Sequence, residues 1–102
     1  MAAEFYITFE DDDWIKNNKK LLEEFISKME IFVEIKENEY RLKQNNTKNY
    51  DVRLIINNDN SILLEINYHP KIIEYELKKL FSWMREKANI FIKDEDGELS
   101  NW

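Results

Sequence analysis

Carboxylates are the side chains of this sequence whose spacing could support chemistry, because eight of its 21 acidic residues lie in two short runs. The runs are Glu10, Asp11, Asp12 and Asp13, and Asp94, Glu95, Asp96 and Glu98. Clustered carboxylate oxygens are ligands for Ca²⁺ and Mg²⁺. An EF-hand calcium loop needs glycine at its sixth position, whereas Gly97 stands fourth from Asp94. A Mg²⁺ site shared by the two runs, as in a nuclease, is a minor alternative that nothing in the spacing requires.

No other residue pattern predicts catalysis. His69 is the one histidine and precedes Pro70, so we expect it to mark the start of a helix rather than to act as a general base. The serines lack a partner base in any pattern that would activate them. The one glycine argues against phosphate-binding loops and nucleophile elbows, which need backbone conformations that glycine adopts freely. We therefore expect a protein that is not an enzyme and uses no cofactor and no metal.

The composition is typical of one folded domain. A chain of 102 residues with 43% hydrophobic and 14% aromatic residues can bury one core, despite 35% charged residues. The absence of cysteine fits a reducing compartment. No apolar run approaches the ~20 residues that span a bilayer, and the N-terminus lacks the pattern of a signal peptide. We expect a cytoplasmic single domain, residues 1–102, in which residues 94–102 form an acidic tail.

The chain is organised around residues 61–68 and the helix that follows them. Ile62, Leu64 and Ile66 alternate as they would on one face of a strand, and Leu63 adds an apolar side chain to the other face. Pro70 suits the first position of a helix. Apolar residues at three- and four-residue steps then extend this helix over residues 70–87.

The remaining elements follow from the same periodicities. Strands are predicted at residues 4–9, 31–36, 39–43, 50–56 and 90–93, and a first helix of about four turns from Trp14 to Met29. Asp12 or Asp13 is expected to cap this helix. Residues 29–34 could extend it instead of forming a strand. The order β-α-β-β-β-β-α-β predicts an α+β fold, with a mostly antiparallel sheet of five to six strands and both helices on one face.

The charge is distributed unevenly. The net charge is −6, yet the residues outside the two acidic runs hold 13 acids and 15 bases. Each run directly follows a predicted strand. If the first and last strands ran in the same direction, both runs would emerge at one edge of the sheet and form one acidic surface; antiparallel strands would separate them. A simpler interpretation is that the first run faces a helix dipole and the second is a solvated tail.

A negative surface restricts the partners that the protein can bind. It disfavours DNA, RNA and anionic membranes, and it favours a basic protein. Three aromatic residues, Tyr75, Trp83 and Trp102, lie away from the main apolar stripes. Each of them either packs under a loop or a sheet edge, or anchors a partner.

In layout the chain resembles the immunity proteins of bacterial polymorphic toxin and contact-dependent growth inhibition systems. The stretches that carry the resemblance are Leu80-Phe81-Ser82-Trp83 in the second helix and Asp94-Glu95-Asp96-Gly97-Glu98 after the last strand. The resemblance implies a cytoplasmic bacterial protein that binds and blocks one cognate toxin domain, often a basic nuclease, without doing chemistry. It implies no particular binding residues.

The two acidic runs, with Trp83 or Trp102 as an anchor, are the predicted contact surface for such a toxin. A nuclease needs a positive cleft to hold phosphates, and carboxylates could occupy that cleft. The alternative is a regulatory or assembly module that pairs through a sheet edge. Strand addition depends on backbone hydrogen bonds rather than on charge, so the two hypotheses differ in their dependence on salt.

Overall fold

The residues that the structure describes form eight regular elements, in the predicted order. The computed structural model describes residues 3–43, 50–67 and 70–102, apart from the side chains of residues 32–35. The elements are β1 (Ala3–Phe9), α1 (Trp14–Ser27), β2 (Phe32–Lys36), β3 (Glu39–Leu42), β4 (Val52–Ile56), β5 (Ser61–Ile66), α2 (Lys71–Lys87) and β6 (Ile90–Lys93). Residues 29–34 do not extend the first helix, which ends at Ser27. The prediction that His69 marks the start of a helix lies outside the described residues.

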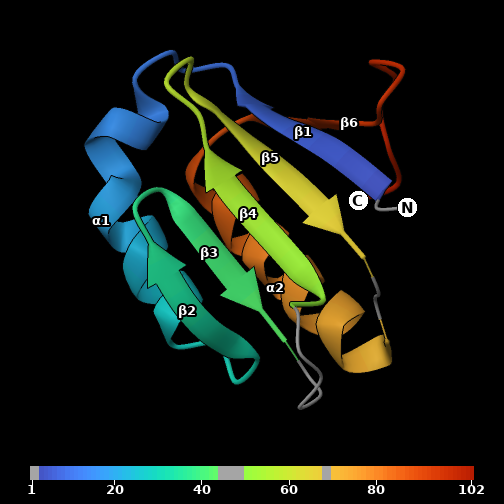
Figure 1. Cartoon of the computed structure of the whole chain (residues 1–102). Helices are drawn as coiled ribbons and strands as arrows, with labels where there is room; N and C mark the ends of the chain where they lie inside the picture. The colour runs from blue at the N-terminus through green and yellow to red at the C-terminus, as the bar shows by residue number, and fades with distance from the viewer. Residues whose placement is uncertain (1–2, 44–49, 68–69) are drawn as a thin grey trace.

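The strands form one six-stranded antiparallel sheet in the order β2-β3-β4-β5-β1-β6 (Figure 1). Short turns join β2 to β3 and β4 to β5. Each contains an asparagine with positive φ, 60° at Asn38 and 62° at Asn60, a conformation that asparagine tolerates better than most residues. β1 pairs with β5 on one side and with β6 on the other. The first strand of the chain therefore lies inside the sheet.

Both helices cover the same face of the sheet, so the predicted α+β architecture is confirmed (Figure 1). Strict alternation points Ile7, Leu54 and Leu64 toward the helices, where all three are fully buried. Leu22 of α1 and Leu80 of α2 are buried in the same core. Full burial of one such aliphatic side chain stabilises the fold by about 1.5–3 kcal/mol.

Tyr40 connects the sheet to the first helix. Its ring is fully buried in the core, and its hydroxyl donates a hydrogen bond of 3.0 Å to Oε1 of Glu23 in α1. Burial first, and then the neighbouring Glu23 carboxylate, raise the pKa of the Tyr40 hydroxyl. A polar group thus enters the core with its partner in place.

The N-terminus of α1 is capped differently from the prediction. Asp13 occupies the cap position, but its side chain makes no capping hydrogen bond. Instead Oδ1 of Asn60, in the β4–β5 turn, accepts a hydrogen bond of 3.0 Å from the backbone N–H of Ile15. Nδ2 of Asn60 donates to the backbone oxygen of Asp11. A turn distant in sequence therefore satisfies the helix end, which a local capping rule could not predict.

The segment 94–102 is part of the fold rather than a solvated tail. Its backbone returns along β6: Leu99 forms a bridge with Lys93, and the N–H of Ser100 donates to the oxygen of Ile92. The half-buried ring of Trp102 meets Phe5 and Phe81 edge-on, with centroids 6.2 and 5.8 Å apart. Packing against the core explains why an acidic segment ends in tryptophan.

Candidate protein interaction surface

The face of the sheet away from the helices presents apolar side chains at its centre. Register places Tyr6 of β1 opposite Leu63 of β5, and Leu63 opposite Ile55 of β4. Phe91 of β6 lies opposite Thr8 and is therefore a diagonal neighbour of Tyr6. Tyr6 and Phe91 are 39% and 42% exposed, and Leu63 and Ile55 are half-buried. We call Tyr6, Ile55, Leu63 and Phe91 the apolar row.

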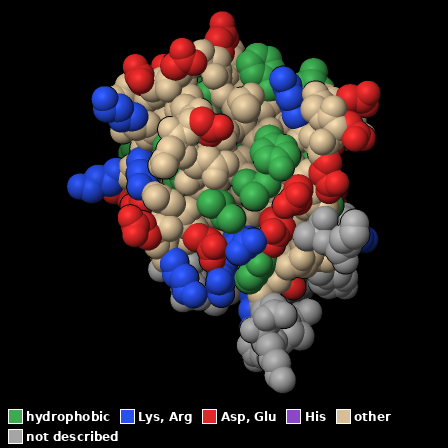
Figure 2. All heavy atoms as spheres, turned by 45° about the horizontal axis from the view of Figure 1, so that its top comes forward, with side chains coloured by type: hydrophobic (Ala, Val, Ile, Leu, Met, Phe, Trp, Pro, Cys, Tyr) green, Lys and Arg blue, Asp and Glu red, His purple; other side chains and the backbone are tan. Residues whose placement is uncertain are grey.

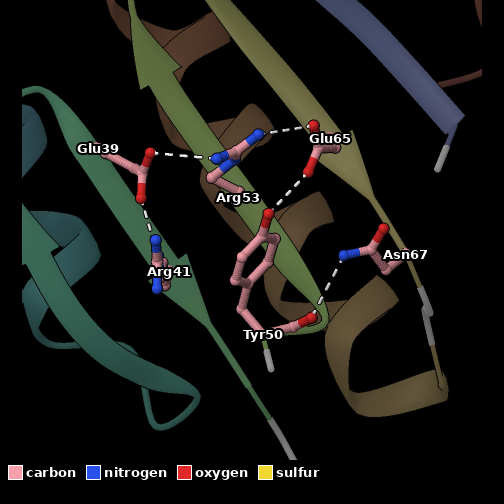
Figure 3. Close-up of polar contacts among 6 residues, drawn as sticks. All are labelled: Glu39, Arg41, Tyr50, Arg53, Glu65 and Asn67. Atoms are coloured by element: carbon pink, nitrogen blue, oxygen red, sulfur yellow. Dashed lines mark hydrogen bonds and ion pairs between the residues drawn. The ribbon is translucent and has the colours of Figure 1, made fainter. Parts of the chain in front are cut away.

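A charged network borders the apolar row at its β3–β4 end (Figure 3). Arg53 bridges two carboxylates, with 2.9 Å from Nη2 to Oε2 of Glu65 and 3.3 Å from Nη1 to Oε1 of Glu39. Glu39 also pairs with Nε of Arg41 at 2.8 Å. The hydroxyl of Tyr50 donates a hydrogen bond to Glu65. The guanidinium groups of Arg41 and Arg53 lie over the Tyr50 ring, 5.0 and 5.3 Å from its centroid.

This network holds side chains of three strands in fixed positions. Arg41 of β3 lies opposite Arg53 of β4. These two like charges would repel each other if the carboxylates of Glu39 and Glu65 did not pair with them. The hydrogen bond from Arg53 to Glu65 raises the pKa of Arg53. The pKa of Tyr50 is also raised, first by burial of its hydroxyl and then by the hydrogen bond to Glu65. Two carboxylates therefore balance the two guanidinium charges within the sheet.

The two acidic runs lie at opposite ends of the β1–β6 pair, so the prediction that they share one edge is wrong. β1 and β6 are antiparallel, with Phe9 opposite Ile90 and Tyr6 opposite Lys93. Glu10 therefore leaves the sheet at one end and Asp94 at the other. At about 3.4 Å per residue, the runs emerge roughly 15 Å apart. The same separation excludes the shared Mg²⁺ site.

The acidic runs nevertheless flank the apolar row. Figure 2 shows hydrophobic side chains in the middle of this face, with acidic side chains gathered on both sides. The side chain of Asn89 donates to Glu10 next to the start of β6, and a carboxylate oxygen of Glu95 accepts from the N–H of Glu4, 3.1 Å away in β1. The result is an apolar centre with a separate negative segment on each side.

Two of the acids shape their own turns. Oδ1 of Asp11 accepts from the N–H of Asp13 at 2.9 Å. Oδ1 of Asp94 accepts from the N–H groups of Asp96 and Glu98 at 2.9 and 3.0 Å, in a turn closed by Gly97 with φ 81°. The carboxylates of Asp12 and Asp96 are exposed. Structural and solvent-facing acids can therefore be separated by mutation.

The predicted aromatic anchors belong to the helix side of the molecule. Trp83 is half-buried, stacks on Phe25 with centroids 4.8 Å apart, and meets Trp14 edge-on. Trp102 packs against Phe5 and Phe81 as described above. Neither indole lies on the face that carries the apolar row, because alternation directs Phe5 toward the helices. The interpretation that these tryptophans pack within the fold agrees with the structure, and a role in binding a partner stays a prediction.

The apolar row had a signal in the sequence that the search for chemistry passed over. Tyr6, Ile55 and Leu63 stand at alternate positions where a water-facing strand normally carries polar residues. Leu63 adds an apolar side chain to the second face of its strand. What the sequence could not give is the register that brings the three side chains into one line across β4, β5 and β1.

Comparisons with known proteins do not assign the chain to a family. A scan against protein-family models, a search of curated proteins and a search of solved structures each found no match. Within the described residues, no three histidine, aspartate or glutamate side chains come together as a metal site would require. No helix in that part of the chain is long and apolar enough to cross a membrane.

Proposed function

We propose that this chain is a non-catalytic inhibitor of the immunity-protein kind, which binds a basic toxin domain through the open face of its sheet. One observation carries the proposal: an exposed apolar row flanked on both sides by carboxylates. Binding surfaces commonly combine an apolar centre with a polar rim, and aromatic residues dominate their energetics. Tyr6 and Phe91 supply the aromatic centre.

The distance between the acidic runs suits one partner. A standard interface covers about 800 Å² on each protein, which is wide enough to include both runs at a separation of roughly 15 Å. The apolar row would provide affinity, and the carboxylates would face the cationic groups with which a nuclease holds phosphates. A partner blocked in this way loses access to its substrate without any chemistry by the inhibitor.

The sheet-edge alternative has less support. Residues 99 and 100 of the chain itself pair with the outer side of β6. At the opposite edge, the register of β2 shifts between Phe32 and Glu34. Such irregularities discourage the addition of a further strand.

A growth assay tests the proposal. The genes adjacent to the one that encodes this chain are expressed one at a time in a bacterial host, with and without the chain. We expect one basic product to arrest growth and the chain to relieve the arrest. In purified form, the double variant Tyr6→Ser/Phe91→Ser should bind that product at least about 100-fold more weakly, as expected when two aromatic anchors are removed.

Matched variants separate the two parts of the surface. Asp12→Lys with Asp96→Lys reverses exposed charges and leaves Asp11 and Asp94 to hold their turns. This pair should also weaken binding, whereas Tyr75→Ser on the helix side should not. Full protection by both the apolar and the charge variants, with folding checked by circular dichroism, would overturn the proposal.

A further inference from the structure

The two most exposed large hydrophobic side chains of the described residues lie in opposite charge surroundings. Leu99 is 70% exposed and follows the acidic turn at residues 94–98. Tyr75 is 60% exposed and lies on α2, near Lys78 and Lys79. Neither residue belongs to the apolar row. Leu99 follows a run of acidic residues, whereas Tyr75 lies beside two exposed lysines that are paired with glutamates of the same helix.

Tyr75 borders a shallow groove on the outside of the helix layer. The groove has a volume of about 510 Å³, and Phe25 of α1 and Trp83 of α2 form its other aromatic walls. Nζ of Lys79 lies 5.2 Å from the centre of the Tyr75 ring. Lys78 also lines the groove, and the one carboxylate among the lining residues is that of Glu86.

The helix layer is the basic side of an acidic molecule. α1 and α2 together hold eight Lys and Arg residues against five Asp and Glu residues, whereas the rest of the chain holds seven against sixteen. Lys78 and Lys79 pair with Glu74 and Glu76 at 3.1 and 3.7 Å, but their side chains stay more than half exposed. They can therefore face a further carboxylate.

Residues 94–99, which we call the acidic hairpin, are ordered by their own hydrogen bonds. Two backbone N–H groups donate to Asp94, the N–H of Asp94 donates to the oxygen of Glu98, and Leu99 forms a bridge with Lys93. Little conformational entropy remains to be lost when the hairpin binds. Its exposed end presents Asp96, Glu98 and Leu99 together.

We propose that the 94–99 hairpin of one copy docks into the helix groove of a second copy, so that the chain self-associates. Leu99 packs against Tyr75, Phe25 and Trp83, and the carboxylates of Asp96 and Glu98 face Lys78 and Lys79. The contact is heterologous, because it joins two different patches, and whether it closes into a dimer or continues to longer oligomers depends on the rotation between copies. It leaves the apolar row uncovered, although the second acidic run takes part in both proposed contacts.

Sedimentation velocity over a series of protein concentrations tests this contact. We expect the wild-type chain to associate, and to associate less at high ionic strength. Leu99→Ser and Tyr75→Ser should each raise the dissociation constant about tenfold or more, since each removes an apolar side chain that the contact buries. An equimolar mixture of the two variants should regain association, because each retains one intact half of the contact.

Variants on the open sheet face provide the control. Tyr6→Ser and Phe91→Ser should leave self-association unchanged. A chain that sediments as a monomer at every concentration would overturn the proposal, as would association that survives both Leu99→Ser and Tyr75→Ser. Loss of association in the Tyr6→Ser variant would overturn it too, because the contact would then use the sheet face.

Discussion

Tyr40 is a core residue whose hydroxyl must keep its proton in the folded protein. Its pKa lies above the ordinary value of 10.0, because the ring is buried and the hydroxyl donates to a carboxylate. In the unfolded chain the pKa returns to about 10. As pH rises beyond that value, the unfolded chain releases the proton and the folded chain does not. The contribution of Tyr40 to stability is therefore complete below pH 10 and is lost at higher pH.

Urea denaturation at neutral pH and above pH 10 measures this effect. Tyr40→Phe should reduce the free energy of unfolding at neutral pH by about 1.5–3 kcal/mol, the usual range for a hydrogen bond to a charged group. The decline of stability above pH 10 should be shallower in the variant than in the wild type. Tyr75→Phe alters an exposed tyrosine and is the matched control. Parallel curves for wild type and Tyr40→Phe would contradict the prediction.

Sequence reasoning located several of the informative residues but not the groups that they contact. Asp13 stands at the cap position of α1 without capping it, and Asp94 holds a turn within a segment that was expected to be a tail. Trp102 packs on Phe5 and Phe81. Residue type and local spacing indicate where a polar or aromatic side chain stands. They do not reveal which distant group will be its partner.

At the scale of elements, Asn60 joins the β4–β5 turn to the start of α1. It accepts from Ile15 and donates to Asp11, and its own backbone has positive φ. Asn60→Gly keeps the turn conformation and removes both hydrogen bonds. We expect it to lower the free energy of unfolding by about 1 kcal/mol, and Asn60→Ala to cost more because alanine also strains the backbone.

Thermal unfolding distinguishes these contributions. Asn58→Ala, at an exposed position of the same turn, is the control and should change the free energy of unfolding by less than about 0.5 kcal/mol. Equal stability of Asn60→Gly and wild type would show that the hydrogen bonds from the turn contribute nothing. Equal losses for glycine and alanine would contradict the role assigned to positive φ.

The direction of β6 could have been deduced from the order of the elements. A strand–helix–strand crossover within one sheet keeps the strand direction, and each hairpin reverses it. Two crossovers and the three reversals from β2 to β5 make β6 antiparallel to β1, as observed. The predicted order was correct, and counting reversals would have separated the acidic runs. The register of the strands could not be deduced in this way, because no local sequence feature determines that Tyr6 lies opposite Leu63.

At the scale of the whole molecule, charge should govern how quickly the proposed partner arrives. The acidic runs extend from the sheet, and long-range attraction mainly raises the rate of association. We expect the association rate constant with the toxin domain to fall at least about tenfold from low to high ionic strength, with little change in the dissociation rate constant. Stopped-flow kinetics with the product found in the growth assay would measure both constants.

Variants of the carboxylates and variants of the apolar row should change different rate constants. Asp12→Lys with Asp96→Lys should slow association and flatten its dependence on salt. Tyr6→Ser should mainly speed dissociation, because the apolar row acts after contact has formed. An association rate that is insensitive to salt would remove the steering role of the carboxylates.

The place of β1 has a consequence for the order in which the domain can assemble on the ribosome. Within this fold β1 precedes every other element, and both strands that pair with it, β5 and β6, follow the β2–β4 meander. During translation the apolar face of β1 has no strand partner while α1 and the β2–β4 meander emerge. The nascent chain therefore exposes β1 unpaired at least until β5 has been made, and chaperones commonly protect incomplete sheets during such an interval.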